Sequence, residues 1–374
     1  MERGGSPRPI DAYITDDSSG INWIKIGDTD ESMFITKTAQ KIRPEGMKKS
    51  RFVEPGDFLL SNSMSFGRPY ILKIEGCIHD GWLVLRDTGN HFDKRFLYYY
   101  LSAKPTYQKF KSMAVGGVVN NLNSEMVRKV MVPIPDKGEQ IAIANLLDKV
   151  AQIIGNRKIE LLKLDELIKA RFVELFGDPV SNPKGWEKKA LSEEAQIKIG
   201  PFGSLLHKED YITGGHALVN PSHIVGGRIT PDDKLTISDE KYDELSAYHL
   251  KIGDVVMGRR GEMGRCAVVE QHGLLCGTGS LLIRTNGDLS ADYIQKIISF
   301  PSFKRTIEDM AVGQTMPNLN VPIVSAFQII KPPKTVQNQY YAFVAQVDKS
   351  KAAVQKSLNE TQLLFDSLMQ EYFG

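Results

Sequence analysis

Cysteine is scarce in this sequence. The 374 residues include three cysteines, Cys77, Cys266 and Cys276, and no two of them have the CxxC spacing of a zinc or redox motif. Thiols so few and so widely spaced exclude a disulfide-stabilised scaffold and a zinc site built from cysteines. They predict reduced thiols, the usual state in the cytoplasm.

Long hydrophobic runs are also lacking. No apolar run approaches the roughly 20 residues that a membrane span needs, and residues 1–4 do not begin a signal peptide. We therefore expect a cytoplasmic protein. The formal net charge is +2, which neither indicates nor excludes nucleic-acid binding, since local basic patches matter more than the total. The length suits two domains of ordinary size.

Catalytic and metal-binding motifs are missing as well. The sequence has no GxxxxGK[ST] loop, no HExxH, and no Asn-Pro-Pro-aromatic tetrapeptide of the kind that amino-methyltransferases use. Its seven histidines have no ligand spacing. Acidic residues at 232 and 239–240 resemble a metal nuclease pattern, but they lie in a polar stretch without an equivalent in the first half. The glycine-rich run 258–264 does not start a helix, so it is no dinucleotide loop. We predict no catalytic residue and no metal site.

The longest pattern that is present is an apolar stripe over residues 137–177. Its residues recur at alternating spacings of four and three, the 3.5-residue period of a coiled coil, and only Arg157 and Arg171 interrupt it. The stripe consists of Ile143, Leu147, Val150, Ile154, Leu161, Leu164, Ile168 and Leu175. A helix of this length spans roughly 60 Å, so it needs a partner helix to bury the stripe.

A second stripe supplies that partner 197 residues later. It comprises Tyr340, Val344, Val347, Lys351, Val354, Leu358, Thr361, Phe365, Leu368 and Tyr372. We expect the two helices to form an antiparallel coiled coil, because a repeated domain–helix unit closes with pseudo-two-fold symmetry in that way. The residues expected in the contact are Leu147, Ile154, Leu161, Ile168, Val347, Val354, Leu358 and Phe365.

The same offset of 197 relates most of the chain to itself. The matches include the Gly-Asp pairs at 56 and 253, the Gly-Arg pairs at 67 and 264, the Met-Ala-Val-Gly runs at 113 and 310, and the Asn-Leu-Asn runs at 121 and 318. The chain is therefore two copies of a globular domain followed by a long helix. Two full copies would need 20 more residues than the chain has, and the shortfall is at the N-terminus. We expect the first domain to begin one strand late and to be the less stable half.

Each copy shows strands first and helices after, which predicts an α+β fold. In the first copy, residues 1–20 are expected to form a loop, and strands are expected at 21–26, 58–61, 70–74, 82–85 and 130–134. In the second, strands are expected near 255–257, 266–269 and 281–283. The predicted domains are 1–136, the central helix 137–177, 178–335 and the C-terminal helix 336–374.

This order of elements resembles the DNA specificity subunit of type I restriction-modification systems. The supporting residues are Pro133-Ile134-Pro135 with Glu139-Gln140, Pro332-Pro333 with Gln337 and Gln339, the Gly-Gly-Ser-Pro loop at 4–7, the Gly-Pro-Phe-Gly-Ser loop at 200–204, the Gly-Asp turns, and Asn182 to Trp186. The resemblance implies two target recognition domains, each reading half of a bipartite double-stranded DNA site. It implies helices that space these domains and dock methyltransferase (M) subunits, with restriction (R) subunits bound through them. It implies no cofactor in this chain, and S-adenosylmethionine, ATP and Mg on the partner subunits.

Basic residues near glycines are the candidate DNA contacts. Arginine can pair with guanine in the major groove, and glycine lets backbone amides approach phosphate. The candidates are Arg3, Gly4, Gly5, Ser6, Arg8, Arg68, Gly117, Gly200, Phe202, Gly203, Ser204, Arg259, Arg260, Arg265 and Gln314. Solvated surface arginines remain the alternative for each. The loops at 116–120 and 313–318 are either DNA-facing or ordinary connections.

The function predicted from these observations is non-catalytic, sequence-specific DNA recognition. Two alternatives stay open on the sequence: a stand-alone DNA-binding nuclease, and a coiled-coil scaffold that does not bind DNA.

Overall fold

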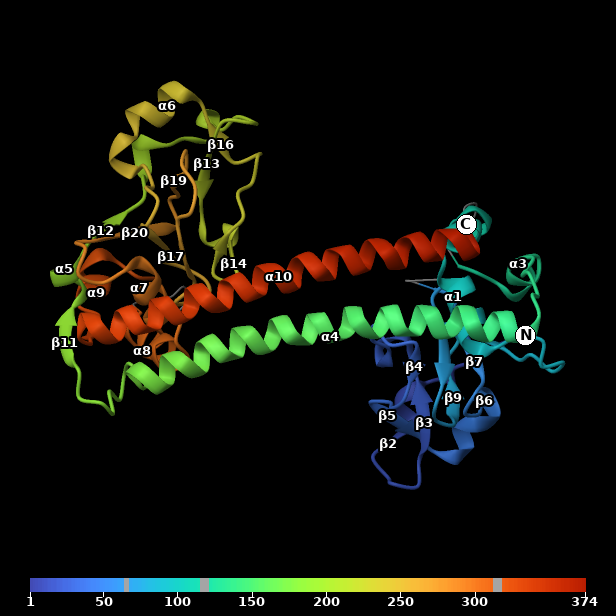
Figure 1. The fold of residues 1–374 in the computed structure, drawn as a ribbon. Helices are drawn as coiled ribbons and strands as arrows, with labels where there is room; N and C mark the ends of the chain where they lie inside the picture. The colour runs from blue at the N-terminus through green and yellow to red at the C-terminus, as the bar shows by residue number, and fades with distance from the viewer. Residues whose placement is uncertain (64–66, 115–120, 312–317) are drawn as a thin grey trace. The chain divides into compact units, whose positions relative to one another are not determined.

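The chain folds into two compact units. The computed structural model describes residues 1–63, 67–114, 121–311 and 318–374. Unit 1 comprises Met1–Leu162 and Lys351–Gly374, and unit 2 comprises Lys163–Ser350, so each unit contains one end of each long helix (Figure 1). Among the helices in the described ranges, none is both long enough and apolar enough to cross a bilayer.

Unit 1 holds the first ten strands and the first helices. The strands are β1 Glu2–Arg3, β2 Ile14–Thr15, β3 Ile21–Ile24, β4 Phe34–Ile35, β5 Gln40–Ile42, β6 Arg51–Val53, β7 Phe58–Ser61, β8 Pro69–Leu72, β9 Gly76–Ile78 and β10 Trp82–Leu85. The helices are α1 Lys94–Ser102, α2 Lys104–Ala114, α3 Ser124–Arg128, the N-terminal part of α4 Lys137–Phe176 and the C-terminal part of α10 Lys334–Phe373. The strands form two mixed five-stranded sheets, ordered β1-β10-β7-β8-β4 and β2-β5-β3-β9-β6.

Unit 2 repeats this plan with a different arrangement of its sheets. Its strands are β11 Glu187–Ala190, β12 Ala195–Ile199, β13 His216–Val219, β14 Ile224–Val225, β15 Arg228–Ile229, β16 Thr236–Ile237, β17 Val255–Gly258, β18 Cys266–Val268, β19 Leu275–Cys276, β20 Ser280–Thr285 and β21 Gln328–Lys331. Its helices are α5 Leu191–Glu194, α6 Asp239–Glu244, α7 Ala291–Ile298, α8 Pro301–Met310, α9 Val321–Ser325 and the N-terminal part of α10 Lys334–Phe373. The sheets are ordered β12-β20-β17-β18, β16-β13-β19, β11-β21 and β14-β15. The predicted α+β class is confirmed.

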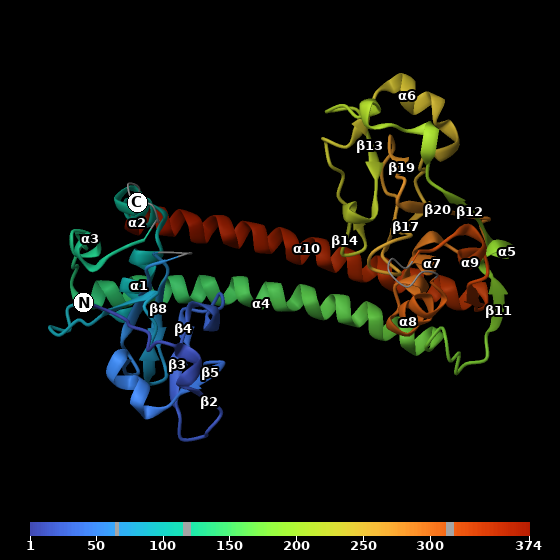
Figure 2. The same ribbon diagram turned by 180° about the vertical axis from the view of Figure 1, so that it is seen from behind.

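The two long helices run in opposite directions within each unit. In unit 1, Ile143 and Leu147 near the start of α4 share a core with Phe373 at the end of α10. In unit 2, Phe172 and Phe176 near the end of α4 contact Tyr340 near the start of α10, with ring centroids 5.6 and 5.3 Å apart. Both views show the two helices alongside each other in each unit (Figures 1 and 2).

The predicted stripe faces the partner helix or the cores. Leu147, Ile154, Ile168, Val347 and Val354 are buried, and Leu161, Leu358 and Phe365 are half-buried. One stripe position is wrong: Tyr372 is exposed, and its neighbour Phe373 is buried against the rings of Phe96 and Tyr100 instead. Arg171, which interrupts the stripe, is half-buried. Its guanidinium lies over the ring of Phe343, 5.5 Å from the centroid, and this cation–π contact stabilises its charge there.

A glutamine side chain at the start of each long helix forms a hydrogen bond with the segment that precedes the helix. The Gln140 side-chain amide donates to the carbonyl of Pro135, and Gln337 donates in the same way to Pro332. Gln140 is buried and its Oε1 also accepts from the backbone N–H of Asp93, the residue that caps α1. These bonds satisfy buried polar groups where a helix begins, which explains why glutamine occurs at this point in both copies.

The Gly-Asp turns hold a repeated ion pair. Asp57 and Asp254 each accept a backbone N–H three residues upstream, and each pairs with an arginine at the end of the neighbouring strand. The Arg86–Asp57 distance is 2.8 Å and the Arg284–Asp254 distance is 2.6 Å. The hydrogen bond to the carboxylate of Asp254 raises the pKa of Arg284.

Asp254→Asn is expected to destabilise unit 2 by about 2–3 kcal/mol, because it leaves a partly buried guanidinium without its counter-charge. The side chain of Asp254 is 3% exposed, whereas that of Asp57 is 14% exposed. Asp57→Asn should therefore have the smaller effect, about 1 kcal/mol on unit 1. Hydrogen exchange of β17 and β7 measures the two effects separately. Equal losses in both units would contradict this explanation.

Two predictions for the first copy are wrong. Residues 1–20 are not a loop throughout, because Glu2 and Arg3 pair with Val84 and Leu83 of β10, and β2 pairs with β5. Residues 130–134 form no strand. The equivalent segment in unit 2, β21, pairs with β11 and with no other strand that the structure describes. Unit 1 has no counterpart of β11 among its described residues, so residues 130–134 have no strand to pair with.

Candidate nucleic-acid interface

In unit 2 the glycine-rich entry loop meets the arginines that follow β17. Ile199, Phe202, Arg259 and Arg260 line a surface hollow of about 360 Å³. Phe202 is 63% exposed, so its ring does not pack in a core. The structure therefore brings together three predicted contacts, Phe202, Arg259 and Arg260, that are up to 58 residues apart in the sequence. Gly203 and Ser204 continue the same loop in a short 3-10 helix.

Gly200 and Gly4 occupy equivalent places in the two units. Gly200 donates its N–H to the carbonyl of Ser280, and Gly4 donates to the carbonyl of Trp82. A Cβ on Gly200 would collide with the carbonyl oxygen of Gly277, and one on Gly4 with that of His79. Both glycines are required for close backbone approach at the start of the loop. They position the loop, and their amides are already used within the protein.

The two adjacent arginines differ in how they are held. Arg259 is half-buried, and its Nε donates to Oδ1 of Asn318 at 3.0 Å. Burial and the neighbouring charge of Arg260 lower the pKa of Arg259. Arg260 is exposed in the same loop. A guanidinium that projects from a fixed backbone is suited to reach a base or a phosphate.

Arg265 is held apart from this cluster by bonds within unit 2. Its guanidinium donates to the carbonyl of Pro221 at 3.1 Å and pairs with Glu262, which also accepts from Lys304. These two cations lower the pKa of Glu262. The predicted contact Arg265 thus lines a second hollow with Lys304, not the one that contains Arg260.

The candidate loop of unit 1 is organised around Asp80. Arg3 donates to its carbonyl at 3.1 Å, the hydroxyl of Ser6 donates to its carboxylate at 2.7 Å, and Arg8 lies 3.7 Å from the same carboxylate. The bond from Ser6 is the main cause that lowers the pKa of Asp80. Gly5 donates its N–H to Ile78. Arg3 and Arg8 are both exposed, so a phosphate can approach either cation of this loop.

Of the three remaining predicted contacts, the structure describes Arg68. Arg68 is exposed at the start of β8, next to Gly67, whose φ of +78° favours glycine. Gly117 and Gln314 lie outside the described residues, as do most positions of the loops at 116–120 and 313–318.

Sequence reasoning missed Thr278 and Gly279, which line the same hollow as Arg260. Gly279 accepts the backbone N–H of Arg259 at 3.0 Å, so this turn fixes the arginine loop. The run Gly277-Thr278-Gly279 carried a usable signal, since closely spaced glycines between two strands mark a turn where backbones approach.

The three cysteines carry no chemistry at this interface. All are free and buried. Burial raises the pKa of the Cys266 thiol to about 11 and that of Cys276 to about 12, so both stay protonated and poorly nucleophilic near neutral pH.

Two known specificity subunits are similar in sequence to this chain. The MjaIX specificity subunit of Methanocaldococcus jannaschii is 22% identical over 91% of this chain and 82% of its own length. The EcoKI specificity subunit of Escherichia coli is 21% identical over 92% of this chain and 77% of its own length.

Solved structures show the same fold. A chain from a study of complex assembly and conformational transition of the type I R-M system matches 99% of this chain and 94% of its own length, with a TM-score of 0.65 and 14% identity. The S subunit of M. genitalium matches 100% of this chain and 99% of its own length, with a TM-score of 0.51 and 16% identity.

The family model described as the type I restriction modification DNA specificity domain matches twice, at residues 6–164 and 183–362. The two matches coincide with the two copies of the internal repeat and together cover most of the chain. Neither they nor the relatives support a stand-alone nuclease. The chain belongs to the type I restriction-modification DNA specificity family, and it is a specificity subunit of that kind.

Proposed function

We propose that this chain recognises a bipartite double-stranded DNA target without cutting or modifying it, unit 1 reading one half and unit 2 the other. The proposal rests on one observation: Phe202, Arg259 and Arg260 line the same hollow of unit 2. Phosphate contacts by arginine supply affinity, and base-edge contacts in the groove supply sequence preference. In unit 1 the corresponding loop carries Arg3 and Arg8.

The long helices are the proposed docking surface for methyltransferase subunits, through which restriction subunits join. Apolar side chains on their outer faces support this, because single exposed leucines are common but several on one helix indicate a partner. The exposed set on α4 is Ile141, Leu146, Ile153, Ile159, Leu162, Leu167 and Val173, and α10 adds Leu363, Leu364 and Tyr372. In this proposal S-adenosylmethionine, ATP and Mg belong to the partner subunits, and the complex acts in the cytoplasm.

Incubation of the purified chain with DNA and Mg²⁺ tests the non-catalytic part of the proposal. The expected result is a gel shift with intact DNA, since the chain supplies recognition alone. Cleaved DNA would contradict the proposal and support a nuclease instead. No shift at low salt, where phosphate contacts are strongest, would favour the scaffold alternative.

A further inference from the structure

A basic stretch of the sequence forms an exposed turn in unit 1. Residues Pro44–Lys49 make a short 3-10 helix, η3, between β5 and β6. Arg43, Lys48 and Lys49 are all exposed, and none of them forms an ion pair within the described part of the chain. Lys49 donates to the hydroxyl of Tyr13 at 3.2 Å, and that partner is neutral. The three positive charges are therefore uncompensated by the protein.

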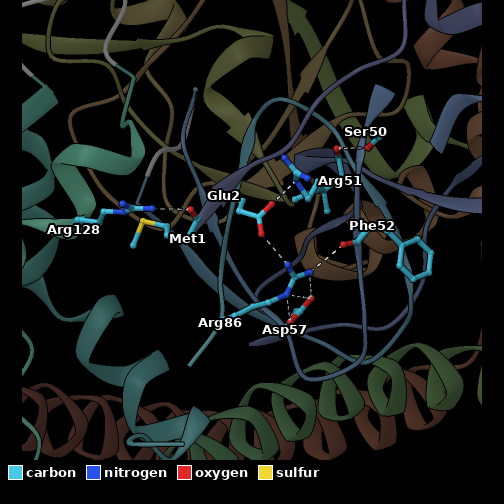
Figure 3. Close-up of polar contacts among 9 residues, drawn as sticks. Met1, Glu2, Ser50, Arg51, Phe52, Asp57, Arg86 and Arg128 are labelled. Atoms are coloured by element: carbon cyan, nitrogen blue, oxygen red, sulfur yellow. Dashed lines mark hydrogen bonds and ion pairs between the residues drawn. The ribbon is translucent and has the colours of Figure 1, made fainter. Parts of the chain in front are cut away.

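The next cation along the chain, Arg51, is bound within the unit (Figure 3). Its guanidinium pairs with Glu2 at 2.8 Å, and Glu2 also pairs with Arg86 at 3.3 Å. The hydroxyl of Ser50 donates to the carbonyl of Ile78 at 2.8 Å. These contacts fix the backbone directly after η3, so its basic side chains project from a held segment and lose less freedom when they bind a ligand.

η3 packs directly against the candidate DNA loop of unit 1. A Cβ on Gly5 would lie 2.8 Å from the carbonyl oxygen of Lys49, and one on Gly46 would lie 3.5 Å from the ring of Pro7. The side chain of Arg8, the next residue in that loop, is 83% exposed. The exposed cations of these two segments form one surface, the basic flank. It consists of Arg8, Arg43, Lys48 and Lys49.

The same place in unit 2 carries the opposite charge. β3 pairs antiparallel with β5 and parallel with β9, and β13 pairs in the same two ways with β16 and β19. The connection after β5 therefore corresponds to the connection after β16, which contains α6. Lys241 of α6 is half-buried and pairs with Glu244 at 3.0 Å. The exposed side chains of α6 are Asp239, Glu240, Asp243 and Glu244, and a surface of this charge repels phosphate.

We propose that the basic flank binds the phosphates of double-stranded DNA beside the half-target that unit 1 reads, and that α6 makes no such contact in unit 2. The inference rests on the proposed function and assigns it a second contact surface. Lysine and arginine contacts to phosphate position a protein on the duplex without reading its sequence. Because each such contact releases counterions, unit 1 supplies the larger share of the salt dependence of binding.

The full chain with Lys48→Ala and Lys49→Ala together tests the proposal. Its affinity for duplex DNA at low salt should fall about tenfold, and the slope of log affinity against log salt should become shallower by about 1 to 2. Its sequence preference, measured by selection from random duplexes, should stay unchanged in both halves. Lys48→Arg with Lys49→Arg keeps both charges and should restore the affinity and the slope.

A second pair of lysines provides the matched control. Lys104 and Lys109 are exposed on α2, which packs in the core of the other sheet of unit 1 through Phe110. Their double alanine variant removes the same charge and should leave the affinity and the slope unchanged. Equal losses for the two double variants would overturn the proposal, because the effect would then be one of net charge alone.

The same measurements separate this proposal from DNA recognition itself. If the unchanged chain binds DNA with a sequence preference and the Lys48→Ala, Lys49→Ala variant has the same affinity and slope, the basic flank is wrong and the recognition function stands. If the unchanged chain binds no DNA even at low salt, both are wrong.

Discussion

Leu147→Asp is expected to destabilise unit 1 by at least about 3 kcal/mol, which is the largest single effect on stability that we predict. Leu147 is fully buried in the core that α4 shares with α1 and with the end of α10. The substitution removes the apolar contacts of a leucine and places a carboxylate among groups that cannot solvate it. The measurement is hydrogen exchange of β7 and β10, which reports on unit 1 separately, since two units need not unfold together.

The adjacent residue provides the matched control. Leu146 lies on the same turn of α4 and is 38% exposed. Leu146→Asp should cost about 1 kcal/mol or less, because its carboxylate can reach water. Similar losses for the two variants would show that the side of α4 facing α10 is not what stabilises unit 1. Leu161→Asp and Leu358→Asp, at half-buried stripe positions, should have effects between these two.

Arg260→Ala is expected to weaken DNA binding by about 1–3 kcal/mol and to relax one half of the target only. The reason is its position: Arg260 is exposed, and it follows Arg259, whose backbone N–H donates to Gly279 and whose side chain donates to Asn318. If the guanidinium contacts phosphate as well, the dependence of binding on salt should become shallower, because fewer counterions are released. Binding measured at several salt concentrations gives both quantities.

Two further variants separate the possible roles of this arginine. Arg260→Lys keeps the charge but loses the two-pronged geometry, so it should restore the salt dependence without restoring the sequence preference if Arg260 reads a base. Arg305→Ala removes another exposed arginine of unit 2, on α8, and should leave the preference unchanged. An Arg260→Ala variant with unaltered affinity, salt dependence and preference would remove this loop from the interface.

The sequence predicted those parts of the fold that depend on local pattern. β7 and β10 were predicted at their observed bounds, because each is a short apolar run bounded by turn residues. The long helices followed from a stripe repeated over many turns. β1 and β2 were missed, since a two-residue strand has no period to detect, and its pairing depends on residues far along the chain. The strand expected at 130–134 failed for a non-local reason: no described residue of unit 1 supplies a strand for it to pair with.

The candidate site was predictable to the same extent. Residue type and neighbouring glycines indicated Phe202, Arg259 and Arg260, which the fold brings to one hollow. The same reasoning also selected Arg265, whose guanidinium is bound to the carbonyl of Pro221, 44 residues away. No local pattern distinguishes an arginine that faces solvent from one that an internal carbonyl holds. Only the folded geometry separates Arg260 from Arg265.

Mapping methylated sites in host DNA, with and without this gene, tests the central claim most directly. One bipartite sequence should lose its methylation when the chain is absent, because the chain alone supplies the sequence preference of its complex. With Arg260→Ala in its place, the half of that sequence read by unit 2 should become degenerate while the other half is retained. A methylation pattern that is identical with and without the chain would contradict its assignment as a working specificity subunit.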